Sequence, residues 1–128
     1  MKLIDANVIL RYLLQEPEEQ AEQARAVIEA GAFTTIEVMA EVVYVLQRIY
    51  SVERAEISAM IHVIAGEIRI ENAEVVLYAA EIFRERKLDF VDCILAARAI
   101  VKQEDVFTFD KKLKAFIQSH KSGLTDEE

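Results

Sequence analysis

The class of fold is indicated first by the opening segment Met1-Lys2-Leu3-Ile4-Asp5-Ala6-Asn7-Val8-Ile9-Leu10. Its first four residues are typical of a short buried strand, and the acidic residue Asp5 ends that strand. Residues 7–14 then place apolar side chains at helical spacing, which predicts a helix directly after the strand. A short apolar strand followed at once by a helix favours a parallel sheet that is covered by helices on both faces.

The same alternation of strands and helices continues along the chain. Further strands are predicted at residues 32–35, 68–70 and 106–107. Helices are predicted at residues 7–14, 17–30, 34–49, 52–65, 73–87, 90–101 and 111–117, with Gly31 as a C-terminal cap and Thr34 with Glu37 as a capping box. We therefore expect an α/β protein: a three-layer α/β/α sandwich with a central parallel sheet of four or five strands.

Composition limits the classes of protein that the chain can represent. With 128 residues, 53% of them apolar, the chain suits one domain, which we place at residues 1–118 before a polar, flexible tail at residues 119–128. The single cysteine excludes an internal disulfide and any multi-cysteine zinc site. No apolar run approaches the roughly 20 residues of a membrane span, and charges at Asp5 and Arg11 interrupt any signal peptide, so we expect a cytoplasmic protein.

Five acidic residues fall where a parallel sheet would bring them together. Asp5 follows the first strand, Asp110 lies just beyond the fourth, Asp89 and Asp92 open the helix from Phe90, and Glu41 lies one turn into the helix after the second strand. Reactive groups in such sheets gather past the carboxyl ends of the strands. Each aspartate alone is also explained by a helix N-terminus, which favours carboxylates. Glu41, among aliphatic neighbours, is expected to be buried and to need a cation.

Acids that converge in this way would repel one another and raise each other's pKa. A divalent cation removes that repulsion, and a set of oxygen ligands suits Mg²⁺ or Mn²⁺. Such a site can activate water for attack on a phosphodiester without a histidine base. The two histidines, His62 and His120, are interpreted as bystanders.

Four blocks of the sequence resemble the PIN-domain family, particularly its VapC-type toxins. They are residues 5–11 around Asp5-Ala6-Asn7, residues 38–46 around Glu41, residues 88–97 from Leu88-Asp89-Phe90-Val91-Asp92, and residues 106–110 ending in Thr108-Phe109-Asp110. One block alone is a weak signal, whereas four in the family's order over nearly the whole chain are specific. The chain shows no clear further strand after Lys114, which many members of the family have.

The resemblance implies a fold, an activity and a set of site residues. It implies a metal-dependent endoribonuclease that uses Mg²⁺ or Mn²⁺ to hydrolyse RNA. The implied acidic quartet is Asp5, Glu41, Asp92 and Asp110, with Asp89 as an accessory metal ligand and with Asn7 and Thr108 as hydrogen-bonding supports. In the toxin branch it also implies a cognate antitoxin protein and a homodimer.

The net charge of −8, from 15 basic and 23 acidic residues, is the wrong sign for a broad nucleic-acid surface. Contacts with the RNA backbone are therefore assigned to a few cations, Arg11, Lys111 and Lys112, with Arg98 and Lys114 as further candidates. An acidic surface also suits a basic antitoxin segment. The apolar helix through Val38–Ile49 can serve as a dimer surface or simply as core.

Three other interpretations are compatible with parts of the pattern. A phosphoacceptor receiver domain needs an aspartate at the end of its third strand, and this chain has Glu71-Asn72 there. It also needs paired acids after its first strand, where only Asp5 stands, so this interpretation is disfavoured. A PIN-fold binding protein without catalysis is disfavoured by the complete quartet. An RNA-processing PIN nuclease without an antitoxin has the same chemistry, and a gene for a DNA-binding protein immediately upstream would favour the toxin.

Overall fold

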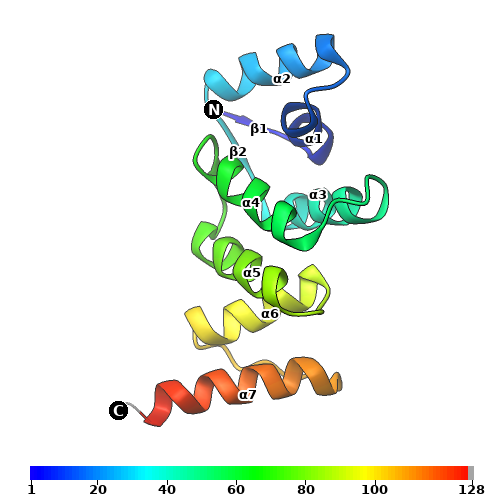
Figure 1. Ribbon diagram of the computed structural model, residues 1–128. Helices are drawn as coiled ribbons and strands as arrows, with labels where there is room; N and C mark the ends of the chain where they lie inside the picture. Colours follow the sequence, from blue (N-terminus) through cyan, green and yellow to red (C-terminus); the bar gives the residue numbers. More distant parts are fainter. Residues whose placement is uncertain (127–128) are drawn as a thin grey trace.

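The computed structural model describes residues 1–126 of the chain and the side chains of residues 1–121. In chain order its elements are β1 (Lys2–Leu3), α1 (Ala6–Leu14), α2 (Glu18–Glu29), β2 (Ala32–Thr34), α3 (Ile36–Arg48), α4 (Arg54–Ala65), β3 (Arg69–Ile70), α5 (Ala73–Glu85), α6 (Phe90–Val101) and α7 (Lys111–Asp126). Figure 1 shows the helices stacked from α2 at the top to α7 at the bottom, with β1 and β2 in the upper half.

The three strands form one parallel sheet in the order β1-β2-β3. Leu3 lies opposite Phe33, which lies opposite Arg69, so these three side chains share one face of the sheet. The buried Thr34 hydroxyl donates to the Ile4 carbonyl across 2.8 Å and ties the end of β2 to the end of β1. Helices α2 and α5 pack against β2 and β3. The predicted α/β class is confirmed, and the arrangement is consistent with an α/β/α sandwich.

The expected number of strands was wrong for the described part of the chain. Residues 102–110 run from α6 to α7 as an irregular segment, and within residues 1–126 no strand forms at 106–107. Leu113 and Ile117 bury α7 against α6, and the Lys121 ammonium donates to the Glu104 carbonyl over 3.2 Å. These contacts hold the segment near α6, far below β1 in Figure 1. The sheet therefore has three strands, with β1 at an edge.

The helix ends confirm one predicted cap and correct another. Gly31 follows α2 with a φ of 107°, a conformation that side chains with a Cβ rarely adopt, as expected of a C-terminal cap. The predicted capping box at Thr34 was wrong, because Thr35 is the N-cap of α3 and accepts a hydrogen bond from the Val38 amide over 3.2 Å. Thr34 lies in β2 instead, where its hydroxyl donates to the Ile4 carbonyl.

The core is densest where α4, α5 and α6 pack together. The fully buried Phe83 of α5 meets Phe90 of α6 edge to face, with ring centroids 5.7 Å apart. Among the described residues, no helix is both long enough and apolar enough to cross a lipid bilayer. The domain boundary at residue 118 and the flexible tail at 119–128 stay predictions. The structure has α7 helical through Asp126, and residues 127 and 128 lie outside the described part.

Candidate functional site

Three of the predicted acids line one surface depression of about 290 Å³ between the start of α6 and the start of α7. They are Asp89, Asp92 and Asp110, and three lysines border the same depression: Lys87, Lys111 and Lys112. We call this depression the α6–α7 acidic site. It joins residues that are up to 25 positions apart in the sequence, from Lys87 to Lys112.

The carboxyl group of Asp92 is affected by its surroundings in this site. The pKa of Asp92 lies above its usual value of 3.8, mainly because partial burial removes water from the carboxylate, and also because Asp110 and Asp89 add negative charge nearby. The nearby charges of Asp110 and Asp89 therefore add to the effect of burial on the pKa of Asp92.

The connection between α5 and α6 is held in place by Arg54 at the start of α4. One guanidinium nitrogen, Nη1, lies 3.1, 2.7 and 2.8 Å from the carbonyl oxygens of Phe83, Arg86 and Leu88. The guanidinium also lies over the Phe83 ring, 4.2 Å from its centroid. Because Leu88 directly precedes Asp89, the contacts of Arg54 fix the backbone from which Asp89 and Asp92 project.

Asp110 is positioned by the first turn of α7. Its carboxylate accepts a hydrogen bond from the Leu113 amide at 2.9 Å, and its own amide donates to the Thr108 hydroxyl at 3.0 Å. Thr108 thus contacts the backbone of Asp110, and its predicted role as a support of the site stays a prediction. Asp5 has the same geometry at α1, where its carboxylate accepts from the Val8 amide at 3.1 Å. One oxygen of each carboxylate therefore serves as a helix cap.

Asp5 and Glu41 line a second depression, of about 400 Å³, between α1 and the end of α3. Asn7 and Arg11 also line it, and the Arg11 side chain donates to the Asn7 side-chain oxygen at 3.2 Å and to the Glu16 carbonyl at 2.8 Å. We call it the α1–α3 acidic site. The expected burial of Glu41 was wrong: its side chain is exposed at the surface of α3, so it needs no cation to be stable there.

The structure thus divides the predicted quartet between two places. Figure 1 shows the end of β1, where Asp5 lies, well above the connection that carries Asp110. Among the described residues no three acidic, histidine or cysteine side chains converge closely enough to hold a metal ion. Carboxylate oxygens are the right donors for Mg²⁺ or Mn²⁺, but the acids of one chain in this arrangement do not form a complete metal site.

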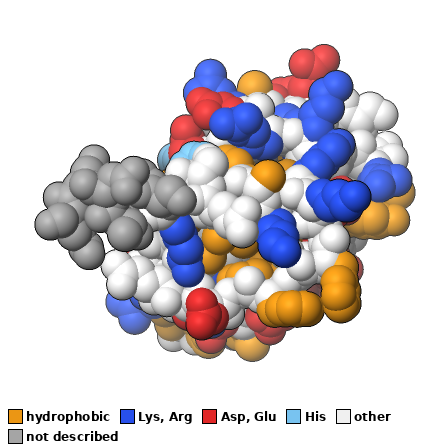
Figure 2. Space-filling model, turned by 90° about the horizontal axis from the view of Figure 1, so that it is seen from below, with side chains coloured by type: hydrophobic (Ala, Val, Ile, Leu, Met, Phe, Trp, Pro, Cys, Tyr) orange, Lys and Arg blue, Asp and Glu red, His pale blue; other side chains and the backbone are white. Residues whose placement is uncertain are grey.

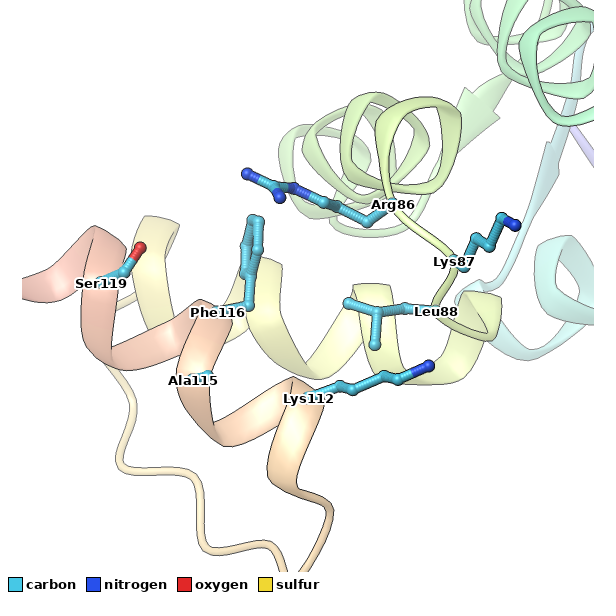
Figure 3. Close-up of a pocket in the computed structure, with 7 residues that line it drawn as sticks. All are labelled: Arg86, Lys87, Leu88, Lys112, Ala115, Phe116 and Ser119. Atoms are coloured by element: carbon cyan, nitrogen blue, oxygen red, sulfur yellow. The ribbon is translucent and has the colours of Figure 1, made fainter.

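Basic residues that sequence reasoning missed lie beside the α6–α7 acidic site. Lys87 borders the acids themselves, and Arg86 lines a neighbouring groove with Lys112 and Phe116. In Figure 3 the Arg86 and Phe116 side chains lie next to each other, and the guanidinium is 5.4 Å from the ring centroid. Figure 2 shows many Lys and Arg side chains over this side of the molecule. The signal was the run Arg84-x-Arg86-Lys87, which is separated from Asp89 by Leu88 alone.

The remaining reactive side chains do not line either acidic site. The Arg98 guanidinium pairs with the Glu104 carboxylate through contacts of 2.8 and 3.0 Å. One of the cations that were expected to contact RNA is therefore paired with an acid of its own chain. His62 bonds the Ser58 carbonyl, and His120 stacks on Phe116, so neither borders the acids. Cys93 is buried in α6, and burial raises the pKa of its thiol to about 12.

Comparison with known proteins agrees with the α/β arrangement of the elements. A family model described as PIN domain matches residues 2–117, which is most of the chain. Curated proteins gave no significant match. The PIN domain is generally a nuclease fold, and its nucleases commonly depend on divalent metals and act on RNA. Since the match covers far more than half of its length, this chain belongs to the PIN domain family.

Proposed function

We propose that the protein is a Mg²⁺- or Mn²⁺-dependent endoribonuclease that hydrolyses RNA phosphodiester bonds. The observation that carries the proposal is the α6–α7 acidic site, where three carboxylates and three lysines share one depression. Partial burial raises the pKa of Asp92, and the nearby charges of Asp110 and Asp89 raise it further, which favours a cation at this place. The surrounding lysines suit the phosphates of a nucleic-acid chain.

In this proposal the residues of the chain divide the work between binding and chemistry. Lys87, Lys111 and Lys112 contact backbone phosphates and hold one phosphodiester over the acids. Asp92 and Asp110, with Asp89 beside them, would hold the metal ion, which would supply an activated water for the phosphodiester. Asp5 and Glu41, which the structure places in the separate α1–α3 acidic site, are proposed as further carboxylates that the activity needs. Asn7 and Thr108 orient neighbouring groups by hydrogen bonds, and Arg11 is a further phosphate contact.

We further propose that the nuclease is the toxin of a toxin–antitoxin pair. The α1–α3 acidic site has Ile49 and Tyr50 on its lining, and both side chains are exposed. An acidic depression beside exposed apolar side chains suits a basic, amphipathic segment of an antitoxin protein. Such a segment would cover Asp5 and Glu41 and so block cleavage.

The first experiment is cleavage of a structured RNA pool by the purified protein in Mg²⁺, Mn²⁺ or EDTA. We expect products with either metal and none with EDTA. Asp92→Asn and Glu41→Gln should lose cleavage, whereas Glu37→Gln should retain it, because Glu37 is exposed on the same helix as Glu41 but lines neither acidic site. Cleavage that persists in EDTA or in Asp92→Asn would contradict the proposal.

A further inference from the structure

A groove of about 370 Å³ opens beside the α6–α7 acidic site, between the α5–α6 connection and α7. Lys87, Leu88 and Lys112 line both the groove and the acidic site, so the two depressions adjoin. Figure 3 shows the groove running from these residues toward Phe116 and Ser119. An RNA chain that is held at the acids therefore has a direct path into the groove.

The groove combines apolar side chains with positive charge. Leu88 and Phe116 supply buried and partly buried apolar surface, whereas Arg86, Lys87 and Lys112 are exposed cations. The described residues that line the groove include no acid, although the whole chain carries a net charge of −8. A matching occupant is therefore anionic and also has an apolar part. A nucleotide has both, because its phosphate is charged and the faces of its base stack on apolar rings.

Phe116 and Arg86 provide planar groups for stacking in this groove. The Arg86 guanidinium lies over the Phe116 ring, 5.4 Å from its centroid, and His120 stacks on the same ring with centroids 4.0 Å apart. Aromatic rings and arginine guanidinium groups are the surfaces on which proteins stack unpaired bases of RNA. The Arg86 side chain is long and exposed, so it can move aside to admit a base next to the ring.

Both walls of the groove are held in place by contacts within the chain. On one side, the Arg54 guanidinium lies 2.7 and 2.8 Å from the carbonyl oxygens of Arg86 and Leu88, which fixes the α5–α6 connection. On the other side, the Phe116 ring packs against the core and stacks on His120. A groove whose walls are already ordered loses little conformational entropy when it binds a ligand.

We propose that this groove binds the base of an unpaired nucleotide next to the phosphodiester that is cut, so that the protein selects single-stranded over double-stranded RNA. The base stacks on Phe116 and Arg86, while Lys87 and Lys112 contact neighbouring phosphates. In a duplex the base is paired and stacked inside the helix and does not reach the groove. This inference rests on the nuclease function proposed above, for which it names the form of RNA.

Binding in EDTA tests the groove without any cleavage. The probes are a short single-stranded RNA that carries one fluorescent 2-aminopurine base and an abasic strand of the same length and charge. The wild type should bind the intact strand about fivefold more tightly than the abasic strand, which is the low end for base stacking on an aromatic ring. It should also quench the fluorescence, because the fluorescent base stacks. Equal affinity for the two strands overturns the inference and leaves a site for phosphates alone.

Variants of the stacking residues assign the base to this groove. Phe116→Leu should lose the preference for the intact strand and the quenching, whereas Phe116→Tyr, which keeps the ring, should behave as the wild type does. Phe107→Leu is the control, because Phe107 is 83% exposed and lies outside the groove lining. Equal losses in Phe116→Leu and Phe107→Leu overturn the inference.

A second variant tests the groove even where Phe116→Leu fails to fold, which circular dichroism would show. Arg86→Gln changes an exposed side chain and should reduce both the affinity for the intact strand and the quenching. Arg84→Gln makes the same change of charge on an exposed residue of α5 outside the groove lining and should leave the quenching unchanged. Quenching that is the same in both arginine variants overturns the inference.

Cleavage separates a failure of this inference from a failure of the proposed function. In Mg²⁺ the wild type should cut the single strand and spare the same strand paired with its complement, and Phe116→Leu should cut the single strand more slowly. Equal cleavage of single strand and duplex, unaffected by Phe116→Leu, overturns the groove and leaves the nuclease function. Base-dependent binding with no cleavage of any RNA in Mg²⁺ or Mn²⁺ contradicts the nuclease function and leaves the base-binding groove.

Discussion

Replacing Arg54 by methionine should destabilise the whole domain, although Arg54 lies far from both acidic sites in the sequence. The side chain joins the start of α4 to the connection between α5 and α6. Methionine keeps much of the aliphatic stem but removes the guanidinium. The change therefore tests the hydrogen bonds and the ring contact more than side-chain volume.

The size of the effect follows from the contacts. Nη1 has two protons for the three carbonyls it approaches, so two charged hydrogen bonds at about 1.5 kcal/mol each give about 3 kcal/mol. Water can reach the exposed Arg86 carbonyl in the variant and offsets part of this, whereas loss of the Phe83 contact adds about 0.5 kcal/mol. We expect the free energy of unfolding to fall by about 2–3 kcal/mol.

Urea unfolding followed by circular dichroism measures this loss, and the melting temperature should fall by about 10 °C. Arg84→Met is the control, because Arg84 is an exposed arginine on the adjacent helix α5. Arg54→Lys should give an intermediate value, since one ammonium reaches fewer carbonyls than the planar guanidinium does. If Arg54→Met and Arg84→Met differ by less than about 0.5 kcal/mol, the Arg54 contacts contribute little and the reasoning is refuted.

Three further predictions concern single groups. Because the pKa of Asp92 is raised in the folded protein, the charge of Asp92 opposes folding at neutral pH. In EDTA, Asp92→Asn should therefore raise the melting temperature at pH 7 but not below pH 3.8, where the carboxyl is protonated in both the folded and the unfolded state. An equal gain in melting temperature at both pH values would contradict this. Thr34→Val keeps the volume of the buried side chain but leaves the Ile4 carbonyl without its donor, so it should cost about 1–2 kcal/mol in urea unfolding. A loss below about 0.5 kcal/mol would show that the hydroxyl contributes little to stability. The double variant Lys111→Glu, Lys112→Glu should bind RNA more weakly and with a weaker dependence on salt. The control variant Arg48→Glu, Arg69→Glu makes the same change in net charge elsewhere and should bind RNA as the wild type does. If filter binding finds the same RNA affinity for the lysine double variant as for the wild type, these contacts are excluded.

Local patterns in the sequence were enough to predict most helices. The helix at residues 90–101 was predicted with its observed bounds, and Gly31 was placed correctly at the end of α2. The capping error at Thr34 shows the limit of such patterns. Thr34 and Thr35 are both suitable N-cap residues in sequence. Thr34 belongs to β2 and bonds Ile4, 30 residues away, which leaves Thr35 as the cap.

The site was predictable in part, for a physical reason. Residues 88–97 hold Asp89 and Asp92 one helical turn apart whatever the tertiary fold, so their proximity followed from the sequence. Joining Asp5 to Asp110 required a fourth strand beside β1. Whether residues 106–109 form that strand depends on competition between the β1 edge and the packing of α7 on α6, which sequence periodicity does not measure.

The buried thiol of Cys93 has a practical consequence for the chemistry of the whole chain. It is the one sulfhydryl among 128 residues, and at a pKa of about 12 almost none of it is thiolate at neutral pH. Thiol-directed reagents therefore find no reactive sulfhydryl on the folded chain, and the sulfur behaves as a hydrocarbon-like filler of α6. A maleimide dye should label Cys93 only after the protein unfolds.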